Sequence, residues 1–68
     1  MIVTVNGEQR RLVDGATVAS LVELLDVPAD ARGIAVALNG EVVSRGRWCE
    51  TELAEGAQVE VVTAVQGG

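Results

Sequence analysis

Only one stretch of this 68-residue chain has the periodicity of a helix, and it lies between segments that have the pattern of strands. In "VASLVELLD", residues 18–26, apolar residues recur at i, i+3, i+4 and i+7. The resulting stripe comprises Val18, Leu21, Val22 and Leu25. Thr17 is the predicted N-cap, and Val27-Pro28 ends the helix because the residue before proline avoids the α region. One helix covers only one face of a sheet, so the other face is predicted to be open.

The flanking segments predict strands joined by tight turns. "MIVTVN" stops at Asn6-Gly7, a two-residue hairpin signal, and "EQRRLV" then returns. "IAVALN" likewise stops at Asn39-Gly40, before the short segment "EVVS". The last strand is predicted for "QVEVVTAV", residues 58–65.

The segment "RGRWCETELAEGA", residues 45–57, follows neither period and predicts an irregular polar connection. Its apolar anchors are Trp48 and Leu53. Trp48 could anchor a partner, but closing the core is the favoured role because it is the only aromatic residue in the sequence. Arg45 and Arg47 are predicted to be solvated.

This order of elements predicts an α+β fold of the β-grasp type: a mixed sheet of four to five strands with one main helix packed on one face. Four valines can face the helical stripe: Val3, Val5, Val59 and Val61. If the first and last strands are central neighbours, they must run parallel, joined by a right-handed crossover. The predicted domain spans residues 1–65, and residues 66–68 project from it as a flexible tail.

The composition limits the partners of this chain. Apolar residues make up 49% of it, enough for one aliphatic core. Five arginines face ten acidic residues, giving a net charge of −5. We therefore expect neither nucleic acid nor an anionic membrane as a partner, and a protein with a basic face is favoured. No signal-peptide pattern or membrane-length apolar run is found, which predicts a cytoplasmic protein.

The residue types argue against catalysis by this chain. There is no histidine and no lysine, so the usual general base, metal ligand and Schiff-base amine are all missing. Cys49 has no histidine to activate it, and the adjacent Glu50 disfavours a thiolate, which predicts a structural or incidental role. We expect no catalytic residues, no metal site and no bound cofactor.

The reactive group that remains is the terminal carboxylate of Gly68, at the end of "VVTAVQGG". A carboxylate becomes reactive when an oxygen is made a leaving group, for instance in an acyl-adenylate formed with ATP. Glycine suits that chemistry because it threads a narrow cleft and adopts whatever backbone angles a partner requires. From the residues alone, a functional tail and a frayed terminus remain equally open.

The stretch from Val36 to Gly68, "VALNGEVVSRGRWCETELAEGAQVEVVTAVQGG", resembles the sulfur carrier protein (ThiS) family of thiamine biosynthesis. Upstream, "VNGE" at residues 5–8 and "DGATVASLVELL" at residues 14–25 resemble that family's first hairpin and helix. The most specific features are "LNGEVV", the R-x-x-W spacing, "VEVVTAVQGG" and the Gly-Gly ending. Ala57 departs from the family, which commonly has an aspartate there.

This resemblance implies a protein co-substrate, which is not itself an enzyme. An E1-like adenylating enzyme would use ATP to adenylate Gly68, which is then converted to a thiocarboxylate and delivers sulfur to thiazole synthase. Gln66, Gly67 and Gly68 would form the tail that enters both partner sites. The last strand has apolar residues at both odd and even positions, so apolar side chains are expected on both faces of the sheet. The face away from the helix is predicted to dock partners through Val62, Ala64 and Val65.

Three other functions compete with this one. A carrier for another pathway, such as the small subunit of molybdopterin synthase, would use the same tail chemistry, although such chains tend to be longer with a proline-rich turn before the glycines. A ubiquitin-like modifier would join Gly68 to lysines of target proteins. A plain interaction module with a frayed end is the remaining alternative.

Overall fold

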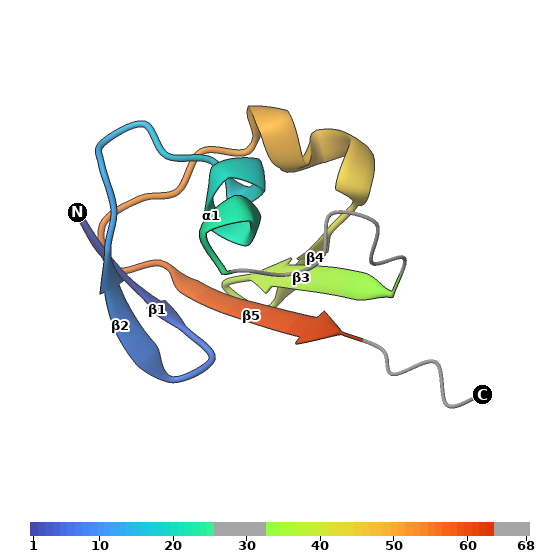
Figure 1. The fold of residues 1–68 in the computed structure, drawn as a ribbon, viewed down its shortest axis with the longest axis horizontal. Coiled ribbons are helices and arrows are strands. Elements are labelled where there is room, and N and C mark those ends of the chain that lie inside the picture. The colour runs from blue at the N-terminus through green and yellow to red at the C-terminus, as the bar shows by residue number, and fades with distance from the viewer. Residues whose placement is uncertain (26–32, 64–68) are drawn as a thin grey trace.

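The chain folds into a five-stranded mixed sheet with a helix on one face (Figure 1). The computed structural model describes residues 1–25 and 33–63. The strands are β1 (Ile2–Val5), β2 (Glu8–Arg11), β3 (Ile34–Leu38), β4 (Glu41–Val43) and β5 (Gln58–Thr63). The helices are α1 (Val18–Leu24) and the 3₁₀ helix η1 (Arg45–Glu50). The predicted α+β, β-grasp architecture is confirmed.

The last strand, β5, lies at the centre of the sheet, whose order is β2-β1-β5-β3-β4. It runs parallel to β1, with Thr4 opposite Gln58 and Val5 opposite Val59. On its other side it runs antiparallel to β3. The expectation that the first and last strands are parallel central neighbours is therefore confirmed.

Both predicted Asn-Gly turns join antiparallel strands. Asn6 and Asn39 have φ angles of 49° and 50°, and the glycines after them have φ angles of 83° and 89°. Two successive residues at positive φ match the right-handed twist of the flanking strands, which is why asparagine and glycine are favoured there.

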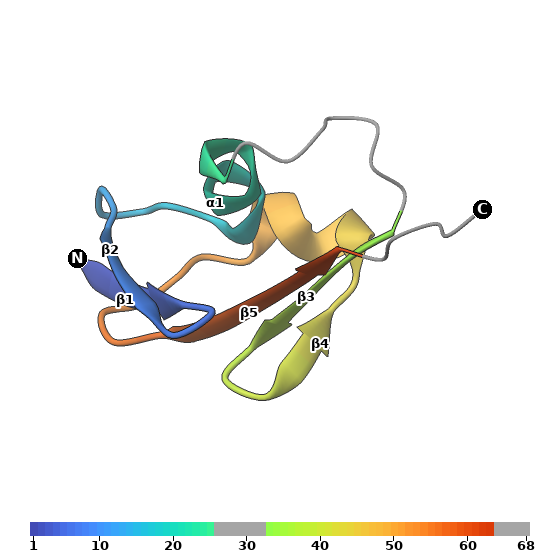
Figure 2. The ribbon, with the colours of Figure 1, turned by 60° about the horizontal axis from the view of Figure 1, so that its bottom comes forward.

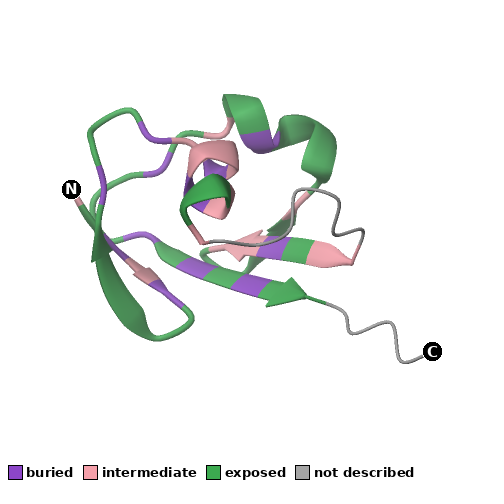
Figure 3. Cartoon of the chain, viewed as in Figure 1, coloured by how far each residue is buried: buried purple, intermediate pink, exposed green. Residues whose placement is uncertain are grey.

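The core lies between the sheet and α1, and Figure 3 shows buried and exposed residues alternating along β5. Val59 and Val61 of this strand are buried, whereas Glu60 and Val62 are exposed. The four valines predicted to face the helix are all buried, as are Val18 and Leu21 of α1. Val22 and Leu25 are half-buried against this core, which confirms the predicted stripe.

Helix α1 begins as the sequence predicts and is shorter at its other end. The Thr17 hydroxyl accepts a hydrogen bond from the Ser20 amide at 3.2 Å, and Ser20 Oγ accepts one from the Thr17 amide at 2.9 Å. This reciprocal capping satisfies two amides at the helix start. The helix ends at Leu24, where the Leu25 amide bonds the Val22 carbonyl at 3.2 Å in a tightened last turn. The predicted stop at Val27-Pro28 lies outside the described residues.

The segment predicted to be irregular forms a 3₁₀ helix, η1, over its first six residues. Its fixed point is Trp48, which is 8% exposed and donates from Nε1 to the Val43 carbonyl at 2.9 Å. The ring therefore closes the core, as expected, and Leu53 is buried with it. Sequence period could not reveal this helix, because it is short and anchored by the burial of one side chain in the core.

The two arginines of η1 are both exposed, as predicted, but Arg45 is not simply solvated. Its guanidinium carbon lies 5.0 Å from the centre of the Trp48 ring, a cation–π arrangement. Arg47 Nε lies 3.4 Å from a carboxylate oxygen of Glu50, and both side chains are largely in solvent. Such an exposed pair contributes little to stability.

Candidate functional site

The predicted tail residues Gln66, Gly67 and Gly68 lie outside the described residues, as do Ala64 and Val65 of the predicted docking face. The structure describes the strand that leads into them. β5 is described to Thr63, and Figure 1 shows it between β1 and β3, at the centre of the sheet. The candidate site is therefore the end of β5 and the surface around it.

The end of β5 is held from both sides. On one side, β3 places Ala35 opposite Val62 and Ile34 opposite Thr63. On the other side, the Asn6 side chain bonds the backbone of Val61, with Nδ2 donating to the carbonyl at 3.0 Å and the Val61 amide donating to Oδ1 at 2.9 Å. The described end of β5 is thus held on both of its sides.

The face of the sheet opposite α1 is open, as Figure 2 shows. Val62 points to this face and is 59% exposed, as the apolar pattern at both parities predicts. Strand pairing brings Ala35 beside Val62 and Ala37 beside Val42. We call these four residues the aliphatic face. Val42 is 79% exposed.

One charged residue lies within this surface. Glu60 is exposed, faces the same side as Val62, and pairs with Ala37 on β3. A carboxylate among aliphatic side chains favours a partner that brings a cation to the same place. Sequence analysis missed Ala35, Ala37, Val42 and Glu60. For Ala35, Ala37 and Glu60 the signal was the alternation within "IAVAL" and "QVEVV", which places small or polar residues on the second face.

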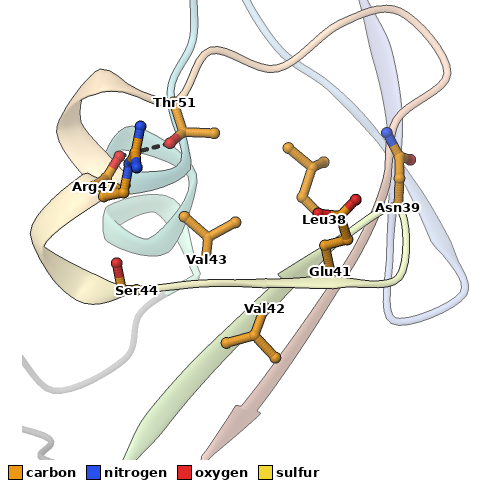
Figure 4. A pocket seen from close by; sticks show the side chains of 8 residues that line it. All are labelled: Leu38, Asn39, Glu41, Val42, Val43, Ser44, Arg47 and Thr51. Carbon is orange, nitrogen blue, oxygen red and sulfur yellow. Dashed lines mark hydrogen bonds between the residues drawn. The ribbon is translucent and has the colours of Figure 1, made fainter.

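A hollow of about 650 Å³ lies beside the edge strand β4, between it and η1. Figure 4 shows Val43 directed to the side of the strand that faces η1, and Val42 directed to the other side. Thr51 Oγ1 donates to the Arg47 carbonyl at 2.6 Å within this hollow. The polar side chains of its lining are Asn39, Glu41, Ser44, Arg47 and Thr51.

The described residues offer little else for chemistry. Cys49 is exposed on η1, and residues 1–25 and 33–63 contain no group of three or more potential metal ligands. In the same part of the chain, no helix is long and apolar enough to cross a membrane.

A sheet whose last strand is central and parallel to the first, with a helix packed on one face, defines a β-grasp domain. Comparison with known proteins gives the family. The ThiS family model matches residues 3–68, so this chain belongs to the ThiS family. Proteins of this family are sulfur carriers of thiamine biosynthesis and perform no catalysis of their own.

Solved structures agree with this assignment. The crystal structure of the thiamine biosynthesis protein (ThiS) from Geobacter metallireducens is 34% identical, with a TM-score of 0.81 and complete coverage of both chains. A solution structure of a thiamine biosynthesis protein from the same organism has 34% identity and a TM-score of 0.79, over all of this chain and 88% of that one. A search of the curated proteins found no match.

Proposed function

We propose that this chain carries sulfur on its C-terminal carboxylate. The Gly68 carboxylate attacks the α-phosphate of ATP in an E1-like adenylating enzyme, giving an acyl-adenylate and pyrophosphate. A sulfur nucleophile supplied by the donor system then attacks the acyl carbon, AMP leaves, and a thiocarboxylate remains. Thiazole synthase receives that sulfur for the thiazole of thiamine. ATP is bound by the activating partner, and the carrier binds no cofactor.

The observation that best supports this proposal is the position of β5. This strand leads directly toward Gly68, and it is the central strand of the sheet, paired with β1 and β3. A tail that continues from a central strand starts at a defined place and direction, which lowers the entropic cost of placing its carboxylate in an active site.

The proposed tail is Gln66, Gly67 and Gly68. Two glycines without Cβ atoms suit a narrow cleft in each partner, and they leave the activated carbonyl unshielded. We place the boundary of the folded domain at residue 65, so residues 66–68 are the part that enters the partner sites.

The tail proposal is tested by three variants: deletion of Gly68, Gly67→Val, and a tag fused after Gly68. Deletion shifts the carboxylate by up to about 3.5 Å, and misplacement of about 1 Å can cost roughly 100-fold in a positioned reaction. The tag converts the carboxylate to an amide, which cannot be adenylated. Each variant is assayed for ATP–pyrophosphate exchange with the activating enzyme, and by intact mass for one oxygen-to-sulfur exchange.

All three variants are expected to lose exchange and thiocarboxylate formation while melting at the wild-type temperature. The matched melts are the control, because a folded but inactive protein places the defect in the tail. Wild-type exchange by the tagged or shortened protein would contradict the proposal. Attachment of the wild-type carrier to lysines of other proteins, without sulfur incorporation, would favour a modifier instead.

We further propose that the open sheet face docks the partner enzymes. The predicted docking residues are Val62, Ala64 and Val65, and the aliphatic face around Val62 supports this surface. Its position beside the end of β5 would let one partner hold the face and the tail together. Glu60 favours a partner surface that is apolar with one basic side chain.

The docking proposal is tested by Val62→Asp, with Val13→Asp as the matched control. Val13 is also an exposed valine, at 78%, but it borders a different hollow, beside α1. Val62→Asp should raise the KM for the carrier in ATP–pyrophosphate exchange about tenfold or more, by placing a second carboxylate in an apolar contact. Val13→Asp should leave it unchanged. Equal effects of the two variants would refute the docking face.

A further inference from the structure

The Asn6 side chain makes two hydrogen bonds to a single residue of β5. Nδ2 donates to the Val61 carbonyl at 3.0 Å, and Oδ1 accepts from the Val61 amide at 2.9 Å. Asn6 and Val61 are 55 positions apart in the chain, so this contact joins the first hairpin to the last strand. Val61 is two residues before the end of β5 at Thr63.

The Asn6 side chain bonds β5 beyond the point at which the backbone of β1 stops pairing with it. β1 ends at Val5, opposite Val59, and the Asn6 amide donates to the Val59 carbonyl at 2.9 Å. The chain then turns away toward β2 through Asn6-Gly7, both at positive φ. A carboxamide offers the same donor and acceptor as a peptide group, so Asn6 extends the parallel ladder by one further step.

This extra step completes the fixation of the strand end. Adjacent residues of a strand direct their backbone groups to opposite sides, so Val61 is bonded toward β1 and its neighbours pair toward β3. From the β3 side, Ala35 lies opposite Val62 and Ile34 opposite Thr63. Without the Asn6 carboxamide, the β1 side of β5 would lose its support before the strand ends.

We infer that Asn6 is a positioning residue for the C-terminal carboxylate: by clamping Val61, it fixes the point and direction from which the tail leaves the sheet. This inference rests on the proposed carrier function, because the clamp has this use only if the carboxylate reacts. Asn6 itself touches no reacting atom. It acts through β5.

The second Asn-Gly turn provides a matched control within the same chain. Asn39 has nearly the same φ as Asn6, and its side chain also bonds β5, with Oδ1 accepting from the Gln58 amide at 3.0 Å. Gln58 begins β5, at the end of the strand away from Thr63. Asn39 therefore shares the turn type, the residue type and the strand partner. It differs in holding the other end of β5, with one side-chain hydrogen bond among the described residues where Asn6 has two.

The test compares Asn6→Gly with Asn39→Gly. Glycine adopts positive φ without strain, so each substitution removes the carboxamide and preserves the turn. Amide hydrogen exchange measures the clamp directly. In Asn6→Gly the Val61 amide is expected to exchange about tenfold faster or more, whereas in Asn39→Gly the increase should be confined to the region of Gln58. Unchanged protection of Val61 in Asn6→Gly would overturn the inference.

Steady-state ATP–pyrophosphate exchange, well below the melting temperature of either variant, measures the consequence. We expect kcat to fall on the order of tenfold in Asn6→Gly, as the carboxylate is misplaced more often, with KM nearly unchanged because the aliphatic face remains. Asn39→Gly should retain both constants within about twofold. A general loss of stability would lower the activity of both variants alike. It would not lower kcat in one variant alone while KM stays unchanged.

Failure of the positioning role of Asn6 can be distinguished from failure of the carrier function. Equal kinetic losses in the two variants, with an active wild-type protein, would overturn the role of Asn6 and leave the carrier function standing. Absence of exchange with the wild-type protein would refute the carrier function itself, and the positioning role with it.

Discussion

The two faces of the sheet are built from the same strands but have opposite character. On the face under α1, Val59 and Val61 are 2% and 9% exposed. On the other face, Val62 is 59% exposed and Glu60 lies beside it. Neighbouring valines on one strand therefore have different uses: one set holds the fold together, and the other is free to contact a partner. The predictions below test how strictly the two faces are separated.

The largest effect is expected from a charge on the helix-side face. Val61→Asp would bury a carboxylate with no cation beside it, at a cost of about 4 kcal/mol or more. A domain of this size has roughly 3 to 10 kcal/mol of stability, so the variant should lose a large part of it and show a strongly lowered melting temperature by circular dichroism. Val62→Asp, one position along, should melt near the wild-type temperature. Similar melts for both would show that the faces are not distinct.

Removal of helix-side volume should be the next largest effect. Leu21 is fully buried in α1, and Leu21→Ala leaves a cavity that costs about 2 to 5 kcal/mol in urea unfolding. The matched control is Leu24→Ala, because Leu24 lies on the same helix but is 63% exposed. That variant should lose less than about 1 kcal/mol. Equal losses would mean that α1 is not anchored through Leu21.

A subtler substitution compares the two faces without changing side-chain shape. Val59→Thr puts a hydroxyl into the core and should cost about 1 to 3 kcal/mol in chemical denaturation. Val62→Thr makes the same change on the open face, where water satisfies the hydroxyl, and should stay within about 0.5 kcal/mol of wild type. The difference between the two measures the burial contrast along β5 directly.

The smallest effect is expected from added volume on the open face. Ala37 pairs with Val42 and Glu60 across neighbouring strands. Ala37→Val should stabilise the protein by a few tenths of a kcal/mol, because a β-branched residue gains cross-strand contacts without meeting a packed layer. A shift in the thermal midpoint measures it. Marked destabilisation would show that this face is already tightly packed.

Much of the fold was predictable from local signals. The two Asn-Gly turns, the Thr17 cap and the stripe of α1 each depend on residues close together in sequence, so local chemistry suffices to predict them. The 3₁₀ helix η1 was missed because its segment has no period of its own and is anchored by one side chain, Trp48, which is buried in the core. The described helix ends at Leu24 in a tightened turn at Leu25, and the predicted stop at Val27-Pro28 lies outside the described residues.

The candidate site, too, was predicted only in part. Val62 was predicted to be exposed because "VEVVTAV" is apolar at both parities and a single helix covers one face. The rest of the aliphatic face and the clamp by Asn6 were not predicted. Each requires knowing which strands are neighbours, and strand order is a property of pairing over long separations.

The sequence by itself determined the strands and the main helix, the turns, the acidic charge, and the residue types that argue against common catalysis. These follow from periods of two and 3.6, from backbone preferences of asparagine, glycine and proline, and from a simple inventory of side chains. Only the tertiary structure decided that Ala35, Ala37 and Val42 join Val62 on one surface, and that Asn6 reaches Val61. The physical reason is that hydrogen bonds between β1, β3 and β5 set the register, and register alone brings residues far apart in the chain to the same place.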